Sequence, residues 1–301
     1  MDLAFDPLDA GTLGDAFAFV RAANPFAQHT WGWDGGRFVD WRWGSNSRRE
    51  AESPGWFARH GAVVSDGGDV AALAVSEEGR GDWCIITPFE APALVDTILG
   101  RLIERSGDTG VSVTFSDDAE WLRRICGRRG LTEDPATGHE WEFDLESSVE
   151  PGVLPEGFSI GALGDDRDAD YAGISGCLQR AFGHDRDARP VLRNLESNPM
   201  FRPDLSIVAR SPGGGVAAYC RGTADPGSGV CGIDPVCTDP GFQRLGLGAE
   251  VVRACFRAQR RLGGRWCYIG SAPEPAPGTR LYRSLGPSAV TTMGTWSLPS
   301  G

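Results

Sequence analysis

The alternation of hydrophobic and polar positions predicts a mixed sheet in the second half of the chain. Short apolar runs bounded by glycine, proline or aspartate are typical of strands, and longer segments with apolar residues three and four positions apart are typical of amphipathic helices. Because strands and helices follow one another, the pattern favours an α/β fold, including the α+β form with a mixed sheet. The predicted strands are 206–210, 216–222, 230–238, 265–270 and 289–297, and the predicted helices are 246–262 and 278–285.

The segment from Glu146 to Phe158 separates two halves of similar length. It has no apolar period and contains two prolines and two glycines, residues that favour turns and extended backbone. A chain of 301 residues is long enough for two domains of roughly 150 residues, each with its own core. We therefore expect one domain at residues 1–148 and a second at residues 149–301.

The two halves resemble each other at an offset of 155 residues. The predicted buried strand 111–115 lies 155 positions before 266–270, and Trp141 lies 155 positions before Trp296. At the same offset, the apolar residues of 94–103 overlay those of the long helix in the second half. An internal duplication explains these matches and predicts that both halves share one fold.

A loop at the end of one predicted strand has the features of a phosphate site. The strand ends near Pro240, and the predicted helix begins at Gly246, with Gly248 in its first turn. Glycines allow the backbone N–H groups of a first helical turn to approach an anion, with the positive end of the helix dipole behind them. Arg244 adds a fixed positive charge. The spacing differs from the dinucleotide and P-loop patterns, so NAD and ATP are unfavoured.

Two motifs in this region resemble the GNAT acyltransferase superfamily. Both occur in the order and at the spacing of that family, and the likeness covers residues 158–298 well and the first half only weakly. The resemblance implies two tandem GNAT-like domains, of which the N-terminal one is degenerate. The motifs are Val236-x-Thr238-x-Pro240 followed by Gln243-x-x-Gly246-x-Gly248, and then Leu281-Tyr282-Arg283-Ser284-Leu285-Gly286.

The resemblance also implies acetyl-CoA as the cofactor. In this family the loop holds the pyrophosphate of coenzyme A, and the preceding strand pairs with the pantetheine arm. The implied pantetheine residues are Val236, Cys237 and Thr238, and the implied pyrophosphate residues are Gln243, Arg244, Leu245, Gly246, Leu247 and Gly248.

Two residues are candidates for proton transfer. Tyr282 stands where the family usually has the acid that protonates the leaving thiolate. Transfer from a thioester to an amine also requires a neutral amine and a donor to the oxyanion. Backbone N–H groups near Val236 are candidate donors, and Asp234, two residues upstream on the same strand, is the candidate base. Two alternatives stay open, namely that Asp234 only shapes a turn before Pro235 and that Tyr282 is a core residue.

The first half lacks this machinery at the matching positions. Pro88, Ala91 and Ala93 replace the loop glutamine and both glycines, and the prolines remove backbone donors. Cys126 stands in place of the tyrosine, and nothing nearby in the sequence would activate it as a nucleophile. We therefore expect the first half not to bind coenzyme A and Cys126 to be structural.

The charge of the chain constrains its partners. The sequence has 29 arginines, no lysine and 41 acidic residues, for a net charge of −12, which disfavours nucleic acid as a partner. Residues 1–150 carry 13 arginines and 27 acidic residues, a net of −14, whereas residues 151–301 carry 16 and 14, a net of +2. An acidic half attracts a small cationic amine such as a polyamine or an aminosugar. A role in solubility alone is equally open.

Aromatic residues crowd between residues 31 and 57. Such a cluster binds a cation by stacking or cation–π contact, or else it packs a core. The aspartates and glycines among the aromatic residues favour irregular structure there. The candidate acceptor-binding residues are Trp31, Trp33, Asp34, Trp41 and His184, and an ordinary surface histidine is the alternative for the last.

Cysteine and histidine positions give no metal motif. The eight cysteines are scattered without a Cys-x-x-Cys pair, which predicts reduced and mostly buried thiols. The N-terminus is acidic and no apolar run reaches about 18 residues, so we expect neither a signal peptide nor a membrane span and place the chain in the cytoplasm. The oligomeric state stays open, a homodimer included.

These observations predict an acetyl-CoA-dependent N-acetyltransferase that acts directly on a small amine in a ternary complex. Two alternatives remain at this point. One is other acyl-CoA chemistry on the same fold, either acyl transfer to a thiol metabolite or acyl-CoA decarboxylation, because the cofactor loop is shared. The other is a scaffold that binds coenzyme A without catalysis.

Overall fold

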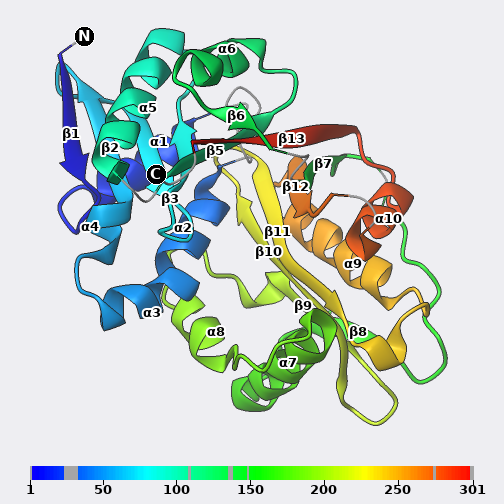
Figure 1. Ribbon diagram of the computed structural model, residues 1–301. Helices are drawn as coiled ribbons and strands as arrows, with labels where there is room; N and C mark the ends of the chain where they lie inside the picture. Colours follow the sequence, from blue (N-terminus) through cyan, green and yellow to red (C-terminus); the bar gives the residue numbers. More distant parts are fainter. Residues whose placement is uncertain are drawn as a thin grey trace. The chain divides into compact units, whose positions relative to one another are not determined.

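The computed structural model divides the chain into two compact units that are not contiguous in sequence (Figure 1). Unit 1 comprises 1–140, 270–275 and 290–301, and unit 2 comprises 141–269 and 276–289. The structure describes residues 2–23, 33–107, 110–134, 138–147, 149–273 and 276–298.

Unit 1 contains a sheet with the strand order β1-β2-β3-β4-β5, followed by the C-terminal strand β13. The β5 and β13 strands pair antiparallel, from Val111 opposite Leu298 to Ser116 opposite Met293. The strands are β1 (Leu3–Pro7), β2 (Gly61–Asp66), β3 (Asp69–Ser76), β4 (Asp82–Ile86), β5 (Val111–Ser116), β6 (Thr132–Glu133) and β13 (Ala289–Leu298). The helices are α1 (Leu13–Ala22), α2 (Gly35–Trp43), α3 (Ser45–Glu52), α4 (Trp56–His60), α5 (Pro92–Ser106) and α6 (Glu120–Arg128).

The sheet of unit 1 has a hydrophobic core on each face. On one face α5 and α6 pack against the sheet through residues such as Ile98 and Ile125. On the other face lies an aromatic core that includes Trp33, Phe38 and Trp41. The sequence favoured irregular structure for this segment, and that expectation was wrong, because residues 35–43 form helix α2. Burial of the aromatic side chains at helical spacing outweighs the low helix propensity of its glycines.

Unit 2 contains a sheet with the strand order β7-β12-β11-β10-β9-β8. The β11 and β12 strands are parallel, and the pairs β11–β10, β10–β9 and β9–β8 are antiparallel. The strands are β7 (Gly138–Asp144), β8 (Ser159–Ala162), β9 (Ser206–Arg210), β10 (Val216–Asp225), β11 (Val230–Thr238) and β12 (Trp266–Ser271). The helices are α7 (Arg167–Phe182), α8 (Arg189–Leu195), η3 (Pro203–Leu205), η4 (Pro240–Phe242), α9 (Leu247–Arg261) and α10 (Pro277–Ser284).

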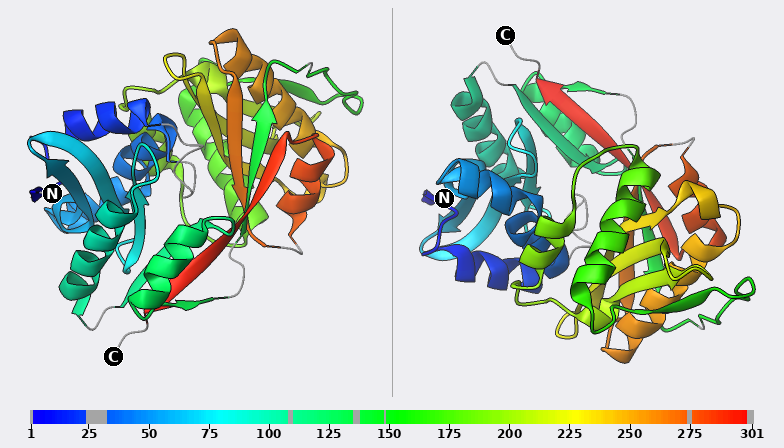
Figure 2. Two further views of the ribbon diagram at one scale, coloured as in Figure 1. Left: turned by 90° about the horizontal axis from the view of Figure 1, so that it is seen from above. Right: turned by 90° about the horizontal axis from the view of Figure 1, so that it is seen from below.

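Helices cover both faces of the unit 2 sheet (Figure 2). The α9 helix buries Val251, Val252 and Cys255 against one face. The α7 helix buries Ile174 and Cys177 against the other. The sheet therefore has a hydrophobic core on each face, as expected for an α/β layer architecture.

The predicted offset of 155 residues is confirmed at the level of whole elements. Helices α5 and α9 each have 15 residues, beginning at Pro92 and Leu247. Strands β5 and β12 each have 6 residues, beginning at Val111 and Trp266. The same order of strand, helix, strand and helix therefore occurs in each half.

The compact units do not coincide with a single cut after residue 148. Most of β7, from Trp141, belongs to unit 2, whereas β13 from Val290 belongs to unit 1. Each unit thus completes its sheet with a strand from the end of the other half of the sequence. The predicted domain boundary between residues 148 and 149 stays a prediction.

All eight cysteines are buried and free of disulfides, as the sequence predicted. No helix in the described part of the chain is long and apolar enough to cross a membrane.

Candidate functional site

Strands β11 and β12 of unit 2 separate after a short stretch of pairing. Their parallel ladder runs from Val230 opposite Trp266 to Gly232 opposite Tyr268, and it ends there among the described residues. The β11 strand continues to Thr238, paired on its other side with β10. The segment from Val236 to Thr238 therefore has an edge without a strand partner in the described structure, and such an edge accepts an extended polar chain by backbone hydrogen bonds.

A β-bulge lies at the point where the two strands separate. Val236 pairs with Cys220 and Ile233 pairs with Gly222, so Asp234 and Pro235 together face one residue of β10. A bulge bends its strand and redirects nearby side chains, which is why bulges are common beside active sites. Asp234, the predicted base, is exposed at this bend.

The turn after β11 is held by Asp239. Its carboxylate is mostly buried, accepts a hydrogen bond of 2.9 Å from the Gly241 N–H and accepts a second of 2.6 Å from Arg180 Nε on α7. The first bond caps η4, in which proline occupies the first turn. The sequence motifs did not identify Asp239 and Arg180 as residues that support this loop. The Asp-Pro-Gly spacing was a readable signal for the cap, whereas nothing in the sequence placed Arg180 beside it.

The loop between η4 and α9 has left-handed backbone at two positions. Arg244 has φ of 65° and is the one non-glycine residue with positive φ among the described residues. Gly246 has φ of 79° and precedes the first residue of α9. The helix ladder begins with the Glu250 N–H donating to the Gly246 carbonyl, so the N–H groups of Leu247 and Gly248 precede it and have no acceptor within the helix.

The exposed surface of this loop is cationic. Gln243, Arg244 and Gly246 are exposed, whereas Leu247 is buried and anchors the helix. Among the described residues Arg244 has no ion-pair partner. Free N–H groups, the positive end of a helix dipole and an unpaired guanidinium together make this loop a candidate anion site.

Gly248 sets how closely α9 approaches β11. A Cβ atom at this position would lie 2.9 Å from Thr238 Oγ1 and 3.6 Å from Leu281 Cδ2. The glycine is therefore needed for packing, whereas at Gly246 no atom lies within 4 Å of such a Cβ and the positive φ is the constraint.

Tyr282 lies on α10 and is 6% exposed, in the core cluster shared with α9. Its ring lies 6.2 Å from that of Trp141. Burial and then the charge of Asp234 raise the pKa of its hydroxyl above the usual range, so the phenol stays protonated at neutral pH. Among the described residues no group hydrogen-bonds this hydroxyl, which leaves its proton available to a bound molecule.

Cys237 lies on the predicted pantetheine strand with its thiol directed away from the α9 core. It belongs to the core cluster under α7, and its Sγ lies 3.6 Å from Cys177 Sγ. The contact with Cys177 and burial raise the pKa of the Cys237 thiol. Only the backbone of Cys237 can therefore hydrogen-bond to an extended ligand along this strand.

The matching region of unit 1 is filled by side chains. Strands β4 and β5 also pair over a short parallel stretch, Asp82 opposite Ser112 and Trp83 opposite Val113. The cavity beside them measures about 20 Å³ and is lined by bulky residues including Trp83 and Trp121. That volume is about the size of one water molecule.

Two further features of this region of unit 1 differ from their counterparts in unit 2. The α5 helix begins with Pro92 after Ala91, so its first turn has fewer N–H donors than that of α9. Burial raises the pKa of the Cys126 thiol to about 12. The side chain is 1% exposed, which supports its expected structural role.

The predicted acceptor residues of the first half have packing roles in the structure. Trp33 and Trp41 are 0% and 4% exposed in the aromatic core of unit 1. The Asp34 carboxylate caps α2 by accepting a 2.7 Å hydrogen bond from the Arg37 N–H. Trp31 lies outside the described residues. Such burial leaves little ring surface for stacking on an acceptor, so this role stays an unsupported prediction.

His184 follows Gly183, which ends α7 in a left-handed conformation. It is exposed, and its ring stacks on that of Phe182 at 6.4 Å. A role in acceptor binding remains a prediction. Among the described residues no group of three or more histidine, cysteine or acidic side chains is arranged to hold a metal ion.

Residues 174–286 match the model of the acetyltransferase (GNAT) family. This range includes the separating strands, the loop at α9 and Tyr282. A search of curated protein sequences finds no significant match.

Solved structures with similar folds extend the likeness to the whole chain. A tandem GNAT protein from the clavulanic acid biosynthesis pathway has a TM-score of 0.65 at 14% identity, covering 100% of this chain and 99% of its own. A GCN5-related N-acetyltransferase from Sphaerobacter thermophilus has a TM-score of 0.61 at 16% identity, covering 99% and 96%. A third, from Kribbella flavida, has a TM-score of 0.56 at 18% identity, covering 86% and 97%. Residues 174–286 are therefore similar to the GNAT acetyltransferase family, and the chain has the fold of the solved GNAT proteins.

Proposed function

We propose that this protein transfers the acetyl group of acetyl-CoA to the amine of a small cationic molecule in a ternary complex. The observation that carries the proposal is the arrangement in unit 2, where β11 leaves β12 after Gly232 and leads into the anion-binding loop at α9. A strand edge followed by a cationic helix start suits a ligand with an extended amide chain and a pyrophosphate.

The residues of this site fit acetyl-CoA. The N–H groups at Leu247 and Gly248, together with the guanidinium of Arg244, would hold the pyrophosphate. The backbone of Val236 to Thr238 would pair with the pantetheine amides, and N–H groups near Val236 would donate to the carbonyl oxygen of the thioester.

Asp234 at the bulge and Tyr282 on α10 would carry out the proton transfers. As the amine nitrogen bonds to the carbonyl carbon, the carbon–sulfur bond breaks and the sulfur takes the proton of the Tyr282 hydroxyl. Its raised pKa keeps this proton in place until the thiolate forms. Asp234 is exposed and its charge acts on the Tyr282 hydroxyl, and it would accept the proton that the amine loses, directly or through water.

The first half would contribute no second cofactor site. The cavity beside β4 and β5 measures only about 20 Å³, and α5 begins with a proline. Both features support this part of the proposal. Its net charge of −14, from 13 arginines and 27 acidic residues in 1–150, supports a cationic acceptor. Cytoplasmic location is proposed on the sequence alone.

Calorimetric titration of acetyl-CoA into the full chain tests the cofactor site, with Gly248→Trp as the blocked variant. A bulky side chain at this position would collide with Thr238, so we expect one site per chain in the native protein and none in the variant. If Gly248→Trp unfolds at the same temperature as the native protein, the loss of acetyl-CoA binding is local. Two sites would contradict a silent first half, and no binding to the native protein would overturn the proposal.

Acetyl transfer is tested by release of free coenzyme A in the presence of spermidine or glucosamine, with product mass as the second readout. N-acetylated product supports the proposal. Binding without turnover on any amine would favour a non-catalytic role. Turnover of malonyl-CoA to acetyl-CoA without an acceptor would favour decarboxylation instead.

A further inference from the structure

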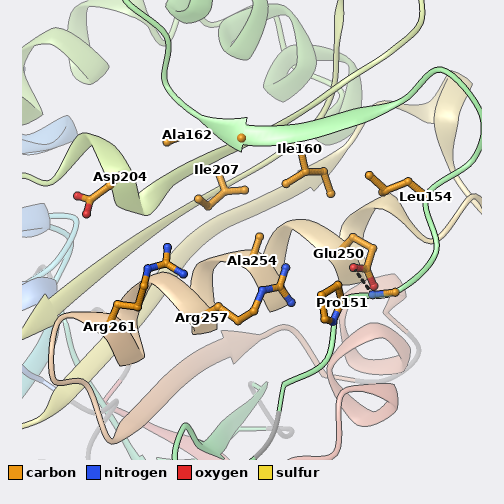
Figure 3. A pocket seen from close by; sticks show the side chains of 12 residues that line it. Pro151, Leu154, Ile160, Ala162, Asp204, Ile207, Glu250, Ala254, Arg257 and Arg261 are labelled. Carbon is orange, nitrogen blue, oxygen red and sulfur yellow. Dashed lines mark hydrogen bonds between the residues drawn. The ribbon is translucent and has the colours of Figure 1, made fainter.

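A groove of about 390 Å³ lies in unit 2 along α9, from Glu250 to Arg261 (Figure 3). Its walls come from α9, from β8 and β9 and from the segment that precedes β8. The surface is mostly apolar, with Leu154, Ile160, Ile207 and Ala254 directed into it. Its volume falls within the range of about 300–1,000 Å³ that is usual for small-molecule sites.

Two arginines project into this groove from the same side of α9. Arg257 and Arg261 are four residues apart, so their side chains lie one helical turn from each other (Figure 3). Arg257 Nη1 donates a long hydrogen bond of 3.4 Å to the Val149 carbonyl. Among the described residues neither guanidinium has a carboxylate partner.

The acidic residues of the groove are already paired. Glu250 is 5% exposed, accepts a 2.7 Å hydrogen bond from the Gly152 N–H and pairs with Arg253. Asp204 pairs with Arg202 at 3.1 Å. The groove therefore has two uncompensated positive charges beside an apolar surface.

We propose that this groove binds a small monocarboxylate with an unbranched apolar chain. The carboxylate would pair with Arg257 and Arg261, because a guanidinium matches the geometry of a carboxylate. The chain would cover Ile160, Ile207 and Ala254 and remove their apolar surface from water.

The two arginines that would hold the carboxylate lie apart from the acyl-CoA site. Arg257 lies ten residues after the first residue of α9, a rise of about 15 Å along the helix from the anion-binding loop. Binding of the carboxylate therefore does not require acyl-CoA, and it is measured without acyl-CoA present.

Calorimetry of the full chain with butanoate, hexanoate and octanoate tests the proposal. Burial of each added methylene should tighten binding about fourfold. Arg257→Gln and Arg261→Gln should each weaken octanoate binding about tenfold, and Ala254→Phe should fill the groove and abolish binding. Arg260→Gln is the matched control, because Arg260 lies on the same turn of α9 but outside the groove, and it should bind octanoate like the native chain.

Thermal unfolding of each variant checks that the fold is retained. Octanol in place of octanoate tests the charge, and it should bind at least about tenfold more weakly. The proposal is overturned if octanoate gives no saturable binding at millimolar concentration, if octanol binds equally well, or if Arg261→Gln and Arg260→Gln behave alike. Failure of acetyl-CoA binding would leave these results unaffected.

Discussion

Replacing Tyr282 with phenylalanine removes one hydroxyl group and preserves the ring. The ring is 6% exposed and packs 6.2 Å from that of Trp141, contacts that phenylalanine keeps. Because no described group hydrogen-bonds the hydroxyl, its removal should change the free energy of unfolding by less than about 0.5 kcal/mol.

The effect on catalysis should be much larger. Loss of a positioned general acid lowers kcat about 10²-fold to 10⁴-fold, which corresponds to about 3–5 kcal/mol of barrier. The Kd for acetyl-CoA should change little, since in the proposed mechanism the hydroxyl acts on the sulfur only as the thiolate forms. Burial raises the pKa of Tyr282, so the group stays protonated, and kcat of the native enzyme should show no loss from its deprotonation up to about pH 9.5.

The assay combines release of free coenzyme A, calorimetry with acetyl-CoA and urea unfolding for each variant. Tyr171→Phe is the matched control, because the Tyr171 hydroxyl donates a 2.6 Å hydrogen bond to Glu196. This control should lose about 1–2 kcal/mol of stability and keep its kcat. A Tyr282→Phe enzyme with kcat within about threefold of native would refute the role of Tyr282 as the acid.

The loop and the thiols give further predictions. Gly246→Ala forces φ of 79° on a residue with a Cβ, which costs about 1–2 kcal/mol and should weaken acetyl-CoA binding about 5-fold to 30-fold by calorimetry. Gly248→Ala should weaken binding about tenfold with a smaller loss of stability, because its Cβ meets only the end of a side chain at 2.9 Å. Asp239→Ala removes the cap and the 2.6 Å ion pair of the turn, and urea unfolding should show a loss of about 1–2 kcal/mol together with weaker acetyl-CoA binding. Because burial raises the pKa of Cys126 to about 12, Ellman's reagent should leave this thiol unmodified in the native chain at neutral pH.

Each of these expectations has a clear contrary result. Native affinity in both glycine variants would mean that the loop does not hold the pyrophosphate. An Asp239→Ala protein with native stability and affinity would show that the turn forms without its cap. Rapid modification of Cys126 in the folded chain would show that the core of unit 1 opens readily.

Local sequence determined most of the elements of the second half. The strand patterns at 206–210 and 230–238 and the helical pattern at 246–262 agree with β9, β11 and α9 within one residue at each end. Such patterns are readable because a strand repeats every two residues and a helix about every 3.6. The repeat at an offset of 155 was readable for the same reason, since matching elements bury matching faces.

The backbone conformation of the loop between η4 and α9 was also predictable from sequence, because its requirements are local. Gly246 provides the left-handed backbone and Pro240 begins the turn, and both act within a few residues of the chain. The aromatic segment at α2 was harder to predict, because the burial of Trp33 and Trp41 depends on a sheet formed by residues far away in sequence.

The contacts between residues far apart in the sequence depend on the fold of the whole chain. In the structure Arg180 pairs with Asp239, Leu281 packs close to Gly248, and the Trp141 ring contacts the Tyr282 ring. The fold also assigned β13 to unit 1 and most of β7 to unit 2. Sequence periodicity reports which face of an element is buried, but the partner of that face is selected by the packing of the whole chain. For that reason the sequence alone could predict the kind of cofactor. The separation of β11 from β12, the small cavity of unit 1 and the groove along α9 could be found only in the folded structure.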